Sequence, residues 1–299
     1  SSELGQTVSD TIVFEHPTPR DIATHLTMAS GGGPMHFGIA AANATPAKPV
    51  LSGWSMRWSG GCSTSVAICG LLAASGDAAG TVPSRRWVLS EPEYAPLRAM
   101  NFGVLVGAIE RFDPTLFNIP PAEAFAMEPR QRLLLEVSYT ALDQSGKRRN
   151  TLASADVGVF VGLLDRDAFV GGSGSVFAVT GSAASVASGR ISYTLGLQGP
   201  CSSIDVACSS TLVTLHSGIL AVSGSESTAS LACGASIKLS PEYSLILAGA
   251  GFLSAAGRCM AFDSRANGIV RGEGVGAVVI QLDTSDSLLS LAGSAVRQD

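Results

Sequence analysis

The cysteine in the stretch DVACSST (205–211) has the setting best suited to chemistry. It lies where an apolar run that predicts a strand gives way to one that predicts a helix, so we expect Cys208 in the first turn of a buried helix. Free backbone N–H groups and the positive end of a helix favour a thiolate, and thiols at such positions titrate at pKa values of ~3.5–7.5. A thiolate can hold an acyl group as a thioester. The alternative is a small packing residue at a tight turn, because free cysteine is among the most buried residue types.

The remaining thiols and imidazoles do not form a recognisable site. The chain has six cysteines and four histidines, and no two cysteines form a CxxC pair. We therefore expect no bound metal and no disulfide framework, and we expect reduced thiols in a cytoplasmic protein. The cysteines that we interpret as packing residues are Cys62, Cys69, Cys201, Cys233 and Cys259.

The composition indicates a globular chain with a large core. Hydrophobic residues make up 46% and charged residues 14%, and the mean hydropathy is +0.32. A formal net charge of −5 argues against a nucleic-acid partner. The longest apolar stretch, 245–257, is too short and too rich in glycine to span a membrane.

Segments with strand character alternate with segments of helical periodicity, which predicts an α/β fold whose sheet is covered on both faces. Gly146 is placed to end one of the helices. The expected strands are 156–164, 202–207, 230–237 and 275–282, and the expected helices are 63–74, 123–146, 182–197 and 208–222.

The stretch GPCSSIDVACSSTLVTLH (199–216) resembles the active-site segment of the β-ketoacyl synthases, specifically the ketosynthase domains of modular type I polyketide synthases. This resemblance implies a thiolase-like fold with layered αβαβα architecture, of which this chain holds the N-terminal portion. Other segments that resemble the family, in the family's order, are 53–61, 82–87, 110–142, 158–162, 185–200 and 262–274.

The resemblance also implies roles for particular residues. Cys208 corresponds to the nucleophile that accepts an acyl chain, which a malonyl-type extender then attacks in a decarboxylative Claisen condensation. Phe262 corresponds to a possible gate of the acyl channel, with a core phenylalanine as the alternative. Glu273 belongs to a structural turn without chemistry, and His216 to a satisfied helix histidine. Segment 127–132 corresponds to one that lies near the interface of a homodimer.

The sequence departs from the family pattern at several places. Val206 stands where threonine is usual, and Trp58 and Ser59 replace a Phe-Pro pair. None of the four histidines fits the family's two catalytic histidine motifs, so we expect those groups to lie outside this chain. We accordingly expect the chain alone to be acylated at Cys208 without elongating the acyl group.

Three segments are expected along the chain. Residues 1–27 resemble the C-terminal end of an acyl carrier protein, 28–49 have the composition of a flexible linker, and 50–299 form the N-terminal part of a ketosynthase. The implied partners are an acyl carrier protein and acyl and malonyl thioesters. No cofactor is expected to bind directly, because the phosphopantetheine serine of the carrier would precede residue 1. The alternatives are a ketosynthase that holds acyl chains without condensing them, and a structural or docking module with a vestigial cysteine.

Overall fold

The computed structural model describes residues 47–87, 101–164, 174–283 and 289–298. The chain divides into two units, Ser1–Pro46 and Ala47–Asp299. The predicted carrier-protein end at 1–27 and most of the predicted linker at 28–49 therefore lie outside the described residues. Among the described residues, no helix has both the length and the apolar character needed to cross a membrane.

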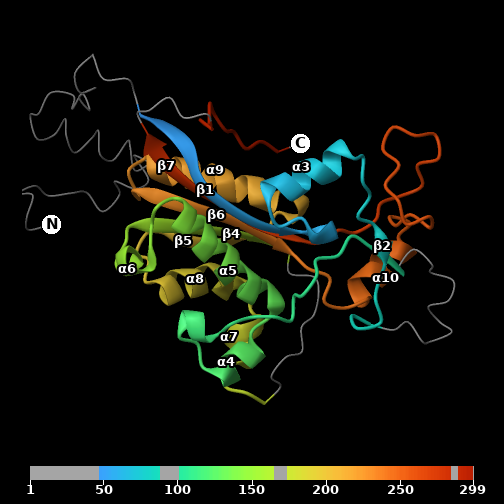
Figure 1. Ribbon diagram of the computed structural model, residues 1–299, viewed down its shortest axis with the longest axis horizontal. Coiled ribbons are helices and arrows are strands. Elements are labelled where there is room, and N and C mark those ends of the chain that lie inside the picture. Colours follow the sequence, from blue (N-terminus) through green and yellow to red (C-terminus); the bar gives the residue numbers. More distant parts are fainter. Residues whose placement is uncertain (1–46, 88–100, 165–173, 284–288, 299) are drawn as a thin grey trace, which may run out of the picture. The chain divides into compact units, whose positions relative to one another are not determined.

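A five-stranded sheet in the order β1-β7-β6-β4-β5 organises the described part of the chain (Figure 1). Strand β4 pairs in parallel with β5 and β6, whereas β7 pairs antiparallel with both β6 and β1. The strands are β1 (Lys48–Trp58), β4 (Val157–Leu163), β5 (Cys201–Ile204), β6 (Ala229–Ser236) and β7 (Gly274–Asp283), and a second small sheet joins β2 (Gly80–Thr81) to β3 (Phe102–Gly103). The predicted α/β class is confirmed, with one antiparallel strand inside a mixed sheet.

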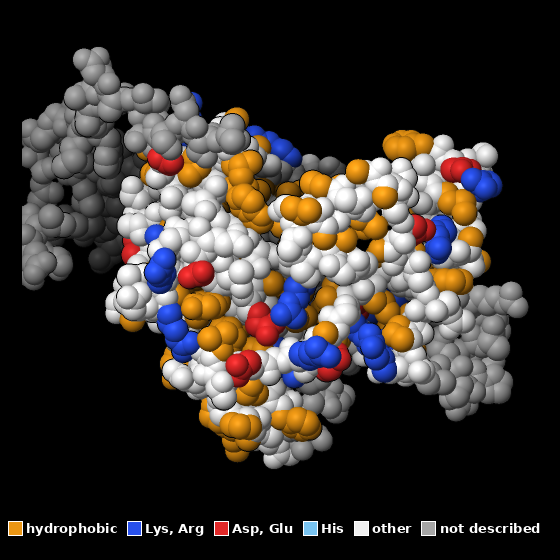
Figure 2. Space-filling view, viewed as in Figure 1, with side chains coloured by type: hydrophobic (Ala, Val, Ile, Leu, Met, Phe, Trp, Pro, Cys, Tyr) orange, Lys and Arg blue, Asp and Glu red, His pale blue; other side chains and the backbone are white. Residues whose placement is uncertain are grey.

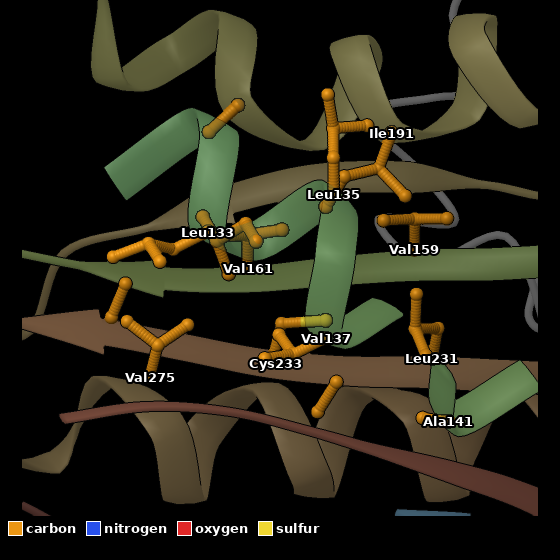
Figure 3. Packing of buried hydrophobic residues seen from close by; sticks show 14 of the residues in the cluster. Leu133, Leu135, Val137, Ala141, Val159, Val161, Ile191, Leu231, Cys233 and Val275 are labelled. Carbon is orange, nitrogen blue, oxygen red and sulfur yellow. The ribbon is translucent and has the colours of Figure 1, made fainter. Parts of the chain in front are cut away.

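Helices cover both faces of the large sheet. Helices α5 (Pro129–Gln144) and α8 (Ala187–Leu195) pack on one face, and α9 (Ser210–Ser223) packs on the other (Figure 1). Alternation along β4 directs its valines and Leu163 toward the face that α5 and α8 cover, where they join the main core. Figure 3 shows this core, in which Leu133 and Val137 of α5 lie against Val161 and Cys233.

Two of the predicted helices are broken in the structure. The segment 123–146 was predicted as one helix but forms α4 (Pro121–Ala126) and α5, separated where Glu128 adopts an extended ψ of 140°. Proline disfavours the helical conformation of the residue before it, so Pro129 explains the break. The segment 182–197 was also predicted as one helix, but it begins at the last residue of α7 (Ala178–Ser182) and contains the 3-10 turn η5 (Ala184–Val186) followed by α8. Gly146 follows α5 with a φ of 83°, as expected for a helix end.

Helix α9 differs from its prediction in burial. Its sequence is apolar almost all round, which predicted a helix buried on every side. One face is buried through Thr214, Ile219 and Val222, but Leu212 and Leu220 are 70% and 56% exposed within the described residues. The remaining helices are α3 (Ser65–Ala73), α6 (Arg149–Leu152) and α10 (Glu242–Gly249), and the remaining 3-10 turns are η1 (Ser59–Gly61), η4 (Thr115–Phe117) and η6 (Ala207–Ser209).

Candidate active site

The chain turns sharply between β5 and α9, and Cys208 lies in this turn. Ala207 has a φ of 56°, in the left-handed region that residues other than glycine rarely adopt. The backbone N–H of Ala207 donates a hydrogen bond of 3.0 Å to Oδ1 of Asp205, which holds this residue in place. Strain of this kind costs ~1–3 kcal/mol and clusters at functional sites. The turn puts Cys208 in η6, two residues before α9 begins at Ser210, and not inside the helix as predicted.

The exposure of the cysteines differs from the sequence interpretation. Cys208 is exposed within the described residues, so it is not the packing residue that was its alternative. Cys62 and Cys233 are buried, as interpreted, and burial raises the pKa of the Cys233 thiol to about 12 despite a contact with the Ser138 hydroxyl. The packing interpretation is wrong for the three exposed thiols Cys69, Cys201 and Cys259. Of the four exposed thiols, Cys208 is the one that lies at the entry to a helix.

Two serines fix the backbone around Cys208. The Ser210 hydroxyl donates to the carbonyl of Ala207 at 2.7 Å and accepts from the N–H of Val206 at 2.9 Å. The Ser209 hydroxyl donates to the carbonyl of Val206 at 3.0 Å. The threonine hydroxyl that Val206 lacks is therefore not needed for these bonds, because the serines on the other side of Cys208 make them.

A row of glycines lets the first turn of α9 approach the sheet closely. Gly162 of β4, Gly234 of β6 and Gly276 of β7 are paired residues on neighbouring strands, so they share one face of the sheet. A Cβ atom on Gly162 would meet the backbone of Ser210 and Thr211 at 2.8 Å, and one on Gly234 would meet Oγ1 of Thr211 at 2.1 Å. The position of Cys208 thus depends on glycine at these two places in the sheet.

The structure places the other predicted site residues as follows. Phe262 lies in the loop between α10 and β7 with a φ of 62°, and its side chain is fully exposed. It is therefore not the core phenylalanine that was its alternative. Nδ1 of His216 lies 2.8 Å from the Ser294 hydroxyl, which agrees with a satisfied histidine. A pocket of about 310 Å³ is lined by Arg85, Glu110 and Arg132 among others, and Cys208 is not part of its lining.

Glu273 lies at the centre of a buried ion-pair cluster that the sequence analysis missed. Its carboxylate accepts two hydrogen bonds from the Arg86 guanidinium, at 2.9 and 3.0 Å, and one each from the backbone N–H groups of Val106 and Lys238, both at 2.8 Å. Lys238 is 1% exposed, and its Nζ donates to the carbonyl of Phe102 at 3.1 Å. These bonds fasten the chain just before β7, in keeping with the structural role expected for Glu273.

Segment 127–132 supplies a second buried polar network. Gln131 is 2% exposed and accepts a hydrogen bond of 2.7 Å from Nε of Arg190, while its amide donates to the carbonyls of Thr180 and Ala183. Arg190 also forms an ion pair with Glu123. The segment therefore links α4, α5, α7 and α8 within one chain, and its place near a dimer interface stays a prediction.

Helical layers on a mixed sheet, with an exposed cysteine at the turn from strand to helix, define a protein of the thiolase-like fold class. Residues 48–285 match the family model described as "Beta-ketoacyl synthase, N-terminal domain". The chain therefore belongs to the β-ketoacyl synthase family, as its motifs predicted.

Relatives and solved structures agree with this assignment. The chain is 37% identical over 303 residues to the spectinabilin polyketide synthase system protein NorA′ of Streptomyces orinoci and 33% identical over 315 residues to the mycoketide-CoA synthase of Mycobacterium tuberculosis. These alignments cover 97% and 100% of this chain but 8% of each relative.

Two solved ketosynthases resemble the structure. The ketosynthase from module 6 of the bacillaene synthase of Bacillus subtilis 168 aligns with a TM-score of 0.68 at 33% identity, and the oxazolomycin ketosynthase domain OzmH KS7 of Streptomyces albus JA3453 with 0.67 at 27%. The alignments cover 78% and 79% of this chain, and 40% and 42% of the two solved chains. The chain thus spans less than half of each solved ketosynthase.

Proposed function

We propose that this chain is part of a polyketide synthase ketosynthase in which Cys208 accepts an acyl group from the phosphopantetheine thiol of a carrier protein. The observation that supports this proposal is the exposed thiol in the strained turn between β5 and α9 of a β-ketoacyl synthase. The matched relatives are polyketide synthase proteins, in agreement with a polyketide pathway.

The proposed acyl transfer uses groups that lie around this turn. The Cys208 thiolate attacks the thioester carbonyl, a new C–S bond forms, and the phosphopantetheine thiolate leaves and takes up a proton. Small neighbours at Ala207 and Ser209 leave room for the incoming thioester.

In the second half of the proposed reaction, a malonyl-type extender loses CO₂, and its carbanion attacks the acyl group on Cys208. The Cys208 thiolate is then released. The groups that stabilise charge at the two carbonyls correspond to the family's two histidines, which we expect outside this chain.

Alkylation and acylation of the full-length protein test the nucleophile. Limiting iodoacetamide should label Cys208 before Cys69, Cys201 and Cys259, which are also exposed. An acyl-pantetheine thioester should add one acyl group to wild-type protein and none to Cys208→Ala, as measured by intact-mass and peptide mass spectrometry. Cys201→Ala is the matched control and should load normally. Acylation that survives in Cys208→Ala, or label concentrated on another thiol, would show that the nucleophile is wrongly assigned.

A condensation assay separates the proposed function from its alternative. Acyl-loaded protein incubated with a malonyl-loaded carrier protein should release CO₂ and give a β-ketoacyl product. Loading without product would identify a ketosynthase that only holds acyl chains. We further propose that Phe262 borders the acyl channel in the complete domain, because its aromatic side chain is fully exposed in the loop between α10 and β7. Replacing Phe262 with alanine should then change which acyl chain lengths load.

A homodimer is also proposed, with contacts at the β5 edge. In the described part, β5 pairs only with β4 and leaves its other edge open, which favours pairing with another strand. Phe125, Val179 and Tyr193, on α4, α7 and α8, are 75–90% exposed, and Figure 2 shows apolar side chains gathered at the bottom of the view, where Figure 1 places α4 and α7. Light scattering should find a dimer in the wild-type protein and a weaker dimer in Tyr193→Asp. A wild-type monomer would refute the proposed homodimer.

A reactive thiol also favours a reducing compartment such as the cytoplasm.

A further inference from the structure

The loop that carries Phe262 is closed at its base by two backbone hydrogen bonds between its arms. The N–H of Ser254 donates to the carbonyl of Ile269 and the N–H of Ile269 to the carbonyl of Phe252, both at 2.8 Å. Further along, the N–H of Val104 donates to the carbonyl of Arg271 at 3.0 Å. Compact loops with close ends are frequently functional. The stem of this loop is thus joined to itself and to a neighbouring segment.

The interior of the loop is also tightly bonded. The Ser254 hydroxyl donates to Oδ1 of Asn267 at 2.6 Å, and the N–H of Val270 lies 3.2 Å from Sγ of Cys259. Gly268 has a φ of 135°, and a Cβ there would meet the backbone of Leu253 at 2.7 Å. These contacts join the two arms of the loop on either side of Phe262, so the position of Phe262 depends on how the stem is oriented.

Arg271, at the end of the loop, attaches the stem to α10. Its guanidinium carbon lies 4.8 Å from the centre of the Tyr243 ring, and Nη1 donates to the Ser244 hydroxyl at 2.9 Å. Ser244 is completely buried, so its hydroxyl is a fixed acceptor. The loop leaves the C-terminal end of α10 and returns to its first turn, so that α10 fixes the loop at both ends.

We propose that Arg271 is a positioning residue for acyl selection. Held by Tyr243 and Ser244, it sets the orientation of the loop and thereby the place that Phe262 takes beside the acyl chain. This inference rests on the proposed function, in which Phe262 borders the channel of an acyl group carried by Cys208. It assigns a role to a contact that lies at the base of the loop and not at its tip.

The test compares acyl chain-length profiles in the full-length protein. Cys208 loading is measured with acetyl- and octanoyl-pantetheine, and alkylation by iodoacetamide is measured in parallel. Arg271→Met should change the octanoyl-to-acetyl ratio by about threefold or more, in the same direction as Phe262→Ala. The double variant should have the same octanoyl-to-acetyl ratio as Phe262→Ala, because Arg271 is proposed to act only through the position of Phe262. Alkylation should stay within about twofold of wild type, which a general disturbance of the fold would not allow.

Matched variants make the outcome decisive. Arg148→Met, an exposed arginine on a different segment, should leave the ratio unchanged. Tyr243→Leu and Ser244→Ala remove the two contacts separately and serve if Arg271→Met does not fold. A ratio unchanged in all of the Arg271, Tyr243 and Ser244 variants, or unchanged in Phe262→Ala, overturns the inference while Cys208 still loads. Loss of loading in wild-type protein would instead reject the proposed function.

Discussion

Replacing Gly162 with alanine should displace the first turn of α9 and with it Cys208. The added Cβ would meet the carbonyl carbon of Ser210 and the nitrogen of Thr211 at 2.8 Å. Non-bonded carbon atoms are normally ~3.5–4.0 Å apart. Because both atoms that it meets belong to the backbone, no side-chain rotation can relieve the contact, and the turn must move away from the sheet by on the order of 0.7–1 Å.

The expected cost has a structural and a chemical part. Overpacking a well-packed site costs about 1–3 kcal/mol, and 1 kcal/mol lowers the Tm of a domain of this size by about 2–4 °C. A misplacement of about 1 Å at a reacting group can lower a rate by about 10²-fold. We therefore expect a modest loss of stability together with a large loss of Cys208 acylation.

Gly276→Ala is the matched control for this prediction. Gly276 lies in the same glycine row, but a Cβ there would have its nearest contacts at 3.8 and 3.9 Å, with Ser55 and Met56. Both variants add one methyl group to a strand interior, so the difference between them isolates the contact with α9. Urea denaturation and the rate of thioester loading should both separate the two variants. Equal stability and equal loading would refute the claim that Gly162 positions Cys208.

Two further predictions concern buried charges and thiols. Glu273→Gln should lower the free energy of unfolding by about 3–5 kcal/mol in urea denaturation, because it leaves the nearly buried Arg86 guanidinium without a charged partner. Asp263→Asn, in an exposed pair, should change the free energy of unfolding far less, and equal effects of the two variants would count against the cluster. The raised pKa of Cys233 predicts that the unfolding free energy falls as pH rises from about 9 toward about 12, because the unfolded chain releases this proton first. Cys233→Ala should have a shallower slope above pH ~9, and an unchanged slope would exclude this thiol as its cause.

Local patterns predicted the elements better than they predicted the breaks and the buried charges. The apolar run 156–164 predicted β4 to within one residue at each end. A strand that is buried on both faces is a continuous apolar run, so it can be recognised without knowing which segments pack on it. The break before α5 was also present in the sequence at Pro129, but the helical periodicity on both sides outweighed it. The ion pair of Arg86 with Glu273 joins residues far apart in the chain, and burial of such charges is visible only once the fold brings them together.

The strand-to-helix turn that contains Cys208 was predictable, but the place of Cys208 before the helix and its exposure were not. An apolar strand followed by an apolar helix indicated the turn, and the motif indicated the thiol. Whether the thiol faces the core or the solvent depends on the left-handed Ala207 and on the glycine row beneath α9. Both features are set by contacts between segments, and single-segment patterns carry no signal for them.

The two faces of the sheet carry different numbers of buried apolar side chains. Stability therefore depends mainly on one face, and the position of the reactive thiol on the other. The face toward α5 and α8 holds most of the buried apolar side chains, whereas the face toward α9 has a small cluster that includes Ile219, Val222 and Ile280. Loss of a core methyl group on the first face should lower stability without moving the turn that holds Cys208, because the sheet lies between them. On the second face, few side chains separate α9 from the strands, so a change of one methyl group reaches the thiol directly. The position of Cys208 therefore depends more on the absence of Cβ atoms at Gly162 and Gly234 than on the packing of the main core.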